Sequence, residues 1–259
     1  MHLEVCIDSV ESAIAAQRGG THRVELCSAL SEGGLTPGAG LIATVRRNLA
    51  IDLFVMIRPR GGDFCYSALE FEVMQQEISH ARNLGADGVV LGILDEEGLV
   101  DIARTSQLVQ LAAPLPVTFH RAIDMTPDLS AALDAVLETG ATRILTSGGA
   151  PNATAGCAEI ARLVQSAKGC IAIMPGGGVS IATVAAIANA TGATEFHASV
   201  RSAFPSPVNF RKQGIVMGDT PDREYRRSIV REDDVRALVG ELERLAAERA
   251  AAQCGSTRA

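Results

Sequence analysis

The chain has 259 residues, enough for one large domain or two small ones, and 47% of them are hydrophobic, an ordinary proportion for a folded core. Its formal net charge is −7. This argues against nucleic acid as a partner, because a phosphate backbone calls for a basic surface. No apolar run approaches the roughly 18 residues of a membrane span. Residues 1–6 have the pattern of a strand rather than of a leader peptide, so we expect a cytoplasmic protein that binds neither nucleic acid nor membrane.

Short β-rich runs alternate with longer stretches of helical period along the chain. The eight expected strands are Leu3–Ile7, Arg23–Leu26, Leu53–Ile57, Gly88–Leu91, Val117–His120, Arg143–Thr146, Ile171–Met174 and Glu195–His197. The expected helices include Val10–Arg18, Ala39–Arg47, Leu69–Leu84, Leu129–Glu138, Cys157–Ala167 and Ile181–Asn189. This alternation predicts parallel strand pairing with right-handed crossovers. Eight such units favour a single (β/α)₈ TIM barrel, and a doubly wound open sheet is the alternative.

The end of the chain departs from this repeat. The segment Ala198–Arg231 is long, polar and contains prolines, and we expect a loop there without regular structure. Such a loop would fold over the barrel mouth, meet another subunit, or simply connect surface elements. A last helix is predicted over Glu232–Ala252, and residues 253–259 are expected to be disordered. We therefore expect one domain, residues 1–252, with an extended C-terminal segment.

Side chains alternate between the two faces of a strand, which sorts the polar residues of the predicted barrel. The apolar faces are expected to pack against the helices, so the mixed faces line the interior. Two strands place a Glu-x-Cys pattern inward, as Glu4 with Cys6 and Glu25 with Cys27.

Other strands add more ionisable groups to the predicted interior, among them Arg58, His120, Glu195 and His197. Buried ions are costly unless they are paired, so we expect Arg58, with His120 or His197, to neutralise the glutamates. One interpretation is a pairing network that only fixes strand register. The other is function, because residues at the C-terminal ends of barrel strands usually serve the active site.

The functional interpretation assigns acid–base chemistry to carboxylates and imidazoles that face one another. The candidate catalytic residues are Glu4, Glu25, Arg58, His120 and His197.

Anion binding is indicated by three loops that follow strands. One carries two arginines and a double glycine, which predicts an oxyanion clamp. The other two are rich in glycine, which lets backbone N–H groups approach a phosphate. Each loop can also be explained as a salt-bridged or tight turn. The candidate anion-binding residues on these loops are Arg58, Arg60, Ser147, Gly176, Gly177 and Gly178, and Ser199, after the eighth strand, is expected nearby.

The six cysteines contain no C-x-x-C spacing, which in a cytoplasmic chain predicts reduced thiols. Cys6 and Cys27 are predicted to lie inward on adjacent strands about 4.8 Å apart, where two thiolates could bind one soft ion such as Cu(I). Barrel stagger could instead place them in successive layers. Burial as two small hydrophobic side chains is the alternative.

Several strings make this chain resemble the CutC family of copper homeostasis proteins. They are Glu4-Val5-Cys6, Arg23-Val24-Glu25-Leu26-Cys27, Glu32-Gly33-Gly34-Leu35-Thr36-Pro37, Ile57-Arg58-Pro59-Arg60-Gly61-Gly62-Asp63-Phe64, Val117-Thr118-Phe119-His120-Arg121-Ala122, Leu145-Thr146-Ser147-Gly148 and Glu195-Phe196-His197. The resemblance covers Met1 to about Arg231. It implies a (β/α)₈ barrel, a cytoplasmic location, a tendency to form homo-oligomers, and Cu(I) coordination by Cys6 and Cys27.

Two functions follow as hypotheses. The first is a copper homeostasis protein that holds Cu(I) through Cys6 and Cys27. The second is a TIM-barrel enzyme that acts on a small phosphorylated or carboxylated metabolite by acid–base chemistry. A binding protein without turnover would share the second site.

Overall fold

The computed structural model describes residues 1–212, 214–215 and 225–256. Eight parallel strands form one sheet in the order β7-β6-β5-β4-β3-β2-β1-β8, and β7 also lies next to β8, so the sheet is a nearly closed barrel. This architecture confirms the TIM-type barrel and rules out the doubly wound sheet. The strands are β1 (His2–Ile7), β2 (Arg23–Leu26), β3 (Asp52–Met56), β4 (Gly88–Leu91), β5 (Val117–Phe119), β6 (Arg143–Thr146), β7 (Ala172–Pro175) and β8 (Glu195–Ala198).

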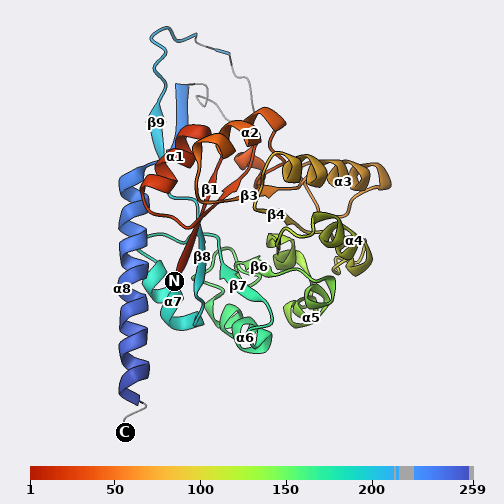
Figure 1. Ribbon diagram of the computed structural model, residues 1–259, viewed down its shortest axis with the longest axis vertical. Coiled ribbons are helices and arrows are strands. Elements are labelled where there is room, and N and C mark those ends of the chain that lie inside the picture. The colour runs from red at the N-terminus through yellow and green to blue at the C-terminus, as the bar shows by residue number, and fades with distance from the viewer. Residues whose placement is uncertain (213, 216–224, 257–259) are drawn as a thin grey trace.

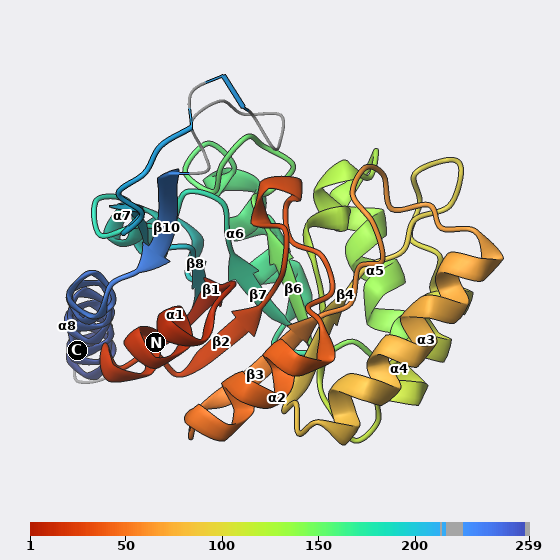
Figure 2. The ribbon, with the colours of Figure 1, turned by 90° about the horizontal axis from the view of Figure 1, so that it is seen from above.

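Helices surround the barrel as an outer ring (Figures 1 and 2). They are α1 (Val10–Arg18), α2 (Ala39–Asn48), α3 (Ala68–Asn83), α4 (Ile102–Ala112), α5 (Leu129–Thr139), α6 (Cys157–Ala167), α7 (Val184–Thr191) and α8 (Glu232–Ser256). Two short 3-10 helices, η1 (Leu30–Glu32) and η2 (Arg121–Met125), follow β2 and β5. No helix in the described part of the chain combines the length and the apolar character that a bilayer crossing requires.

Local sequence signals explain where the helices begin and end. Ser67 and Glu70 form a capping box at the start of α3, and Asp128 accepts two backbone N–H bonds at the start of α5. Gly140 ends α5 with φ +82°, a conformation that costs glycine little because it has no Cβ. The chain can therefore turn back into β6 within a few residues.

The barrel contains two separate hydrophobic regions. The outward strand residues, such as Leu3 and Val5, pack against the helix ring in a large core. A smaller inner core lies inside the barrel and consists of Cys6, Cys27, Phe54, Met56 and Val90. This separation agrees with the sorting of strand faces by alternation, and the inward polar residues share the barrel interior with the smaller core.

Strand register brings the polar residues of β1, β2 and β8 into line. Glu4 of β1 pairs in register with Arg23 of β2 on one side and with His197 of β8 on the other. Cys6 is in register with Glu25, so Cys27, two residues later and just past the end of β2, lies at the next level. The two cysteines therefore come from successive levels of the barrel, as the stagger of a closed sheet requires.

The segment after β8 is more regular than the sequence predicts. We expect a loop over Ala198–Arg231, but its described parts form an antiparallel hairpin of β9 (Arg201–Pro205) and β10 (Arg226–Val230). The hairpin projects from the barrel next to α1 and α8 (Figures 1 and 2). Neither arm alternates polar and apolar residues, and Pro205 further argues against a strand, so the sequence carries no period-two signal for this pairing.

The final helix is longer than expected. Helix α8 extends to Ser256, so it includes four residues of the tail that we expect to be disordered. Residues 257–259 of that tail lie outside the described residues.

Candidate functional site

A buried network of charges fills the lower part of the barrel interior. Arg23 donates to Glu4 at 2.5 Å and to Glu195 at 2.9 Å, and Arg143 donates to Glu195 at 2.5 Å. Both guanidinium groups also lie against the ring of Phe54. The expectation that Arg58 neutralises these glutamates is therefore wrong. Arg23 and Arg143 do so because register places them at the level of the carboxylates, whereas Arg58 follows the end of β3.

His197 connects this network to the upper part of the interior. Its Nδ1 lies 2.7 Å from Glu4 Oε1, and its Nε2 lies 3.8 Å from Glu25 Oε2. Burial alone lowers the pKa of His197, but the Glu25 and Glu4 carboxylates raise that pKa well above its usual value. Burial likewise tends to raise the pKa of Glu4, but Arg23 and His197 lower it to about 2. The Glu4–His197 pair therefore carries opposite charges near neutral pH.

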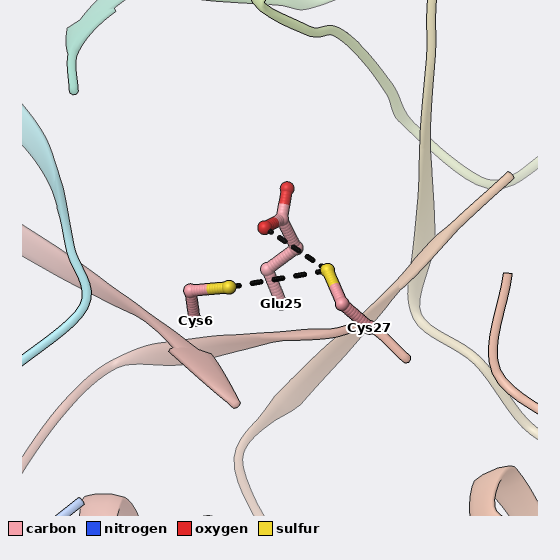
Figure 3. A group of neighbouring side chains, drawn as sticks. All are labelled: Cys6, Glu25 and Cys27. Carbon is pink, nitrogen blue, oxygen red and sulfur yellow. Dashed lines mark hydrogen bonds between the residues drawn. The ribbon is translucent and has the colours of Figure 1, made fainter. Parts of the chain in front are cut away.

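The two cysteines approach each other beside Glu25 (Figure 3). Cys6 Sγ lies 3.9 Å from Cys27 Sγ, and Cys27 Sγ lies 3.5 Å from Glu25 Oε2. These three ligand atoms all lie within 4.8 Å of one another, and all three residues are buried. The sulfur separation is far larger than the roughly 2.05 Å of a disulfide bond, so both thiols are free.

The two thiols have unequal acidity. The hydrogen bond with Cys27 and the interaction with His197 together lower the pKa of Cys6 to about 5, against the effect of burial. The shared hydrogen bond and burial raise the pKa of Cys27 well above its usual value. Burial also raises the pKa of Glu25 well above its usual value, although the His197 charge at 3.8 Å opposes that rise. Cys6 is therefore the thiol that ionises first.

A pocket of about 430 Å³ opens above the thiols at the C-terminal ends of the strands. Cys6, Glu25 and His197 line it from the strands. The loops after the strands contribute the remaining polar lining, which is Glu32, Gly33, Arg58, His120, Arg121, Asp124, Gly177, Gly178 and Ser199. A pocket of this volume is typical of sites for small molecules.

Arg58 and His120 both line this pocket and are both buried. Arg58 donates to the carbonyl groups of Glu32, Gly34 and Gly62, and no described residue accepts from its Nε. His120 Nδ1 accepts the backbone N–H of Ala122. Burial and the nearby Arg58 charge lower the pKa of His120 to about 3. The imidazole is therefore neutral, with its proton on Nε2, and that Nε2 has no partner among the described residues.

Two of the predicted anion-binding residues are engaged elsewhere. Arg60 is outside the pocket lining and donates to Glu70 at 2.6 Å and to Asp63 at 3.0 Å. Gly176 continues the ladder between β6 and β7. In contrast, Gly177, Gly178 and Ser199 all line the pocket.

The loop after β6 already holds a carboxylate of the chain itself. Asp124, from η2, accepts the backbone N–H groups of Ser147 and Gly149 and the hydroxyl groups of Thr146 and Ser147. It also pairs with Arg121 at 2.8 Å. The Asp124 carboxylate therefore occupies the position where the sequence predicts a bound ligand anion. Ser147 binds Asp124 rather than a ligand.

Four residues of the site are absent from the residues predicted from sequence. They are Arg23, Arg143, Arg121 and Asp124. Arg23 shares the inward face of Glu25 and could have been chosen from alternation alone, and Arg121 directly follows His120. Asp124 has no sequence signal, because its partners lie on a loop more than 20 residues further along the chain.

The fold and the site define a TIM-barrel protein whose mouth contains a buried thiol pair beside a carboxylate. The CutC family model matches residues 1–202. A human protein named copper homeostasis protein cutC homolog is 48% identical over 237 residues, which is 91% of this chain and 87% of the human protein. A CutC family protein of Chromobacterium violaceum is 49% identical over 236 residues, or 91% and 96% of the two chains. The chain belongs to the CutC family.

A solved structure supports the same assignment. The CutC protein from Streptococcus agalactiae superimposes with a TM-score of 0.73 and 35% identity over 76% of this chain and 97% of its own. Most of the β9–β10 hairpin and all of α8 lie beyond the residues that the family model matches.

Proposed function

We propose that this protein binds Cu(I) through Cys6 and Cys27 and serves copper homeostasis in the cytoplasm. The observation that carries the proposal is the 3.9 Å separation of the two buried sulfurs. Typical metal–thiolate bonds are about 2.3 Å, so one ion can reach both sulfurs without strand movement. Soft thiolate ligands select Cu(I) among the common biological metals. The names of the human and Streptococcus relatives point in the same direction.

Glu25 is the third group that supports this site. Its carboxylate lies 3.5 Å from Cys27 Sγ, so it is close enough to contact a bound ion or to accept the proton of a thiol. Cys6 and Glu25 both line the open pocket, which gives an ion a path from solvent. The charged residues beneath the thiols hold β1, β2 and β8 in the register that brings the ligands together.

The test is anaerobic titration with Cu(I) in competition with a chromogenic Cu(I) chelator. We expect the wild-type protein to bind one ion, and Cys6→Ser and Cys27→Ser each to abolish that binding. Cys170→Ser is the matched control, because Cys170 is exposed and distant in sequence from both ligands. Unchanged stoichiometric binding in the double variant Cys6→Ser with Cys27→Ser would show that this site is wrong.

A second candidate function is an enzyme that acts on a small anionic metabolite. It is favoured by the position of His197 between two carboxylates in a pocket of about 430 Å³. In this proposal Glu4, Glu25 and His197 supply acid and base, and Arg58 and His120 orient the substrate. Metabolite screening with native mass spectrometry tests it. Saturable binding without turnover would instead favour a binding protein.

We also infer that the protein forms homo-oligomers. Phe204 and Phe210 on the C-terminal segment are 50% and 74% exposed, and such apolar groups commonly mark contact surfaces. Light scattering of the purified protein measures the subunit count. A monomer at micromolar concentration would contradict this inference.

A further inference from the structure

We propose that the barrel mouth contains an oxyanion subsite built on Arg121, which binds the phosphate or carboxylate group of a small ligand. This inference deepens the second candidate function, because it names the residue that would hold the anion. It does not depend on copper binding. The observations that support it are unpaired hydrogen-bond donors that line the same pocket.

The guanidinium of Arg121 is held by hydrogen bonds along only one of its edges. Its Nε donates to Asp124 at 2.8 Å and its Nη2 donates to Ser147 Oγ at 2.7 Å. Its Nη1 has no partner among the described residues, and 43% of the side chain is exposed. A guanidinium that is held in this way keeps a preformed set of N–H donors for a bidentate contact with an oxyanion.

Asp124 is therefore a positioning residue for Arg121 rather than a competitor for the ligand. Its carboxylate is 6% exposed and already accepts bonds from Ser147, Gly149 and Thr146. Those hydrogen bonds, together with the pair with Arg121, compensate the negative charge of Asp124 at the loop after β6. The free Nη1 of Arg121 remains available on the pocket side.

The loop after β7 supplies two more donors. The carbonyl groups of Gly177 and Gly178 accept bonds from Ala153 and Thr183, and their own N–H groups have no protein acceptor among the described residues. Both glycines line the pocket with φ above +80°. A Cβ at Gly177 would lie 3.4 Å from Arg121 Nη1, so Gly177 and the guanidinium are neighbours, and Gly178 directly follows.

His120 gives the independent sign of a ligand. The residue is 4% exposed and lines the same pocket, and no described residue accepts its Nε2–H. A buried donor without an acceptor costs about 1–3 kcal/mol, which a ligand oxygen would recover. The apolar part of the lining, Met56, Phe64, Met125 and Leu145, suits a ligand with a short carbon body.

The test measures binding of inorganic phosphate and of succinate by isothermal titration calorimetry. The wild-type protein is expected to bind at least one of the two probes, and the preferred probe identifies a phosphate or a carboxylate ligand. Arg121→Gln is expected to weaken that binding at least tenfold, and Arg121→Lys to weaken it less. Arg60→Gln is the matched control and should change binding less than twofold, because Arg60 lies outside the pocket.

Amide NMR keeps the proposal testable if an Arg121 variant fails to fold. Addition of the bound probe to the wild-type protein should shift the Gly177 and Gly178 amide resonances. Absence of binding by both probes, unshifted glycine amides, or an equal loss in Arg60→Gln would overturn the subsite. Binding without any turnover would contradict the enzyme function alone and would leave the subsite in place.

Discussion

At the scale of single residues, the charge network shows how a barrel interior can hold ions. Arg23 contacts two carboxylates, Glu4 and Glu195, and is almost fully buried. Removal of one member of such a group leaves an uncompensated buried charge, which costs more than the pair contributes. The network therefore makes strand register sensitive to single substitutions.

We expect Arg23→Met to lower the free energy of unfolding by about 3–5 kcal/mol, because the buried Glu4 and Glu195 then each lose one of their cations. Urea unfolding at pH 7 measures the change. Arg162→Met is the control, because the Arg162–Glu159 pair on α6 lies at the surface, where such pairs contribute less than about 1 kcal/mol. Equal losses in the two variants would show that the network contributes no more than surface pairs do.

The depressed pKa of Glu4 predicts a loss of stability in acid. The pKa falls from 4.5 to about 2 in the folded protein, mainly because Arg23 offsets the effect of burial. Stability from this group is therefore fully present above pH 4.5 and is lost as the pH falls towards 2, by about 3 kcal/mol in total.

Urea unfolding from pH 7 to pH 2 measures this slope. Glu4→Gln should be less stable than the wild-type protein at pH 7 and should lose less stability over the acid range. A parallel decline in both proteins would show that other carboxyl groups cause it.

At the scale of elements, sequence patterns locate the barrel strands well but do not determine which side chains of neighbouring strands face each other. Period-two alternation placed Glu4, Cys6, Glu25 and Cys27 inward, where the structure has them. Alternation describes one strand at a time, however. The pairing of Glu4 with His197 depends on the register between β1 and β8, which lie nearly 200 residues apart in sequence.

Helix α8 is an integral part of the barrel, although it follows the hairpin. Leu238, Leu242 and Leu245 are buried against the α1–α7 side of the ring. We expect Leu242→Ala to destabilise the protein by about 2–5 kcal/mol through lost burial and the resulting cavity. Chemical denaturation measures it, with Leu69→Ala on α3 as control because Leu69 is 75% exposed. A loss below 1 kcal/mol would mean that α8 packs only loosely.

The hairpin, in contrast, should be dispensable for the site. No described residue of β9 or β10 lines the pocket, and Ser202 lies opposite Ile229 in the ladder. Replacement of residues 203–228 by an Asn-Gly turn should therefore leave the Cu(I) affinity within twofold of the wild-type value. The competition assay measures it, with the full-length chain as control. Loss of copper binding in a variant that remains folded would indicate that the hairpin takes part in the site.

At the scale of the whole molecule, the interior is arranged in levels from the charge network through the thiols to the pocket. The sequence predicts the inward glutamates and cysteines of the lower levels, because they lie at strands where the face follows from local pattern, but it does not identify Arg23 and Arg143 as the cations of that network. The rim is built from loops that meet only in the closed barrel. Asp124 and Arg121 belong to the loop after β5 yet act on the loops after β6 and β7. Their role therefore follows from three-dimensional contacts rather than from spacing.

These levels predict that copper and an oxyanion stabilise the molecule independently. The proposed copper ligands lie on β1 and at the end of β2, whereas Arg121 and the glycine amides lie on the segments after β5 and β7. Each ligand at about 100 times its Kd should stabilise the fold by about 2.7 kcal/mol and raise Tm by about 5–10 °C. Effects at separate sites without shared contacts add, so both ligands together should give the sum.

Differential scanning calorimetry with each ligand alone and with both measures this additivity. Cys6→Ser should abolish only the copper-dependent rise, and Arg121→Gln should abolish only the rise caused by the oxyanion. A combined rise well above or below the sum would mean that the two sites are coupled. Coupling is reciprocal, so each ligand would then change the affinity for the other by the same factor.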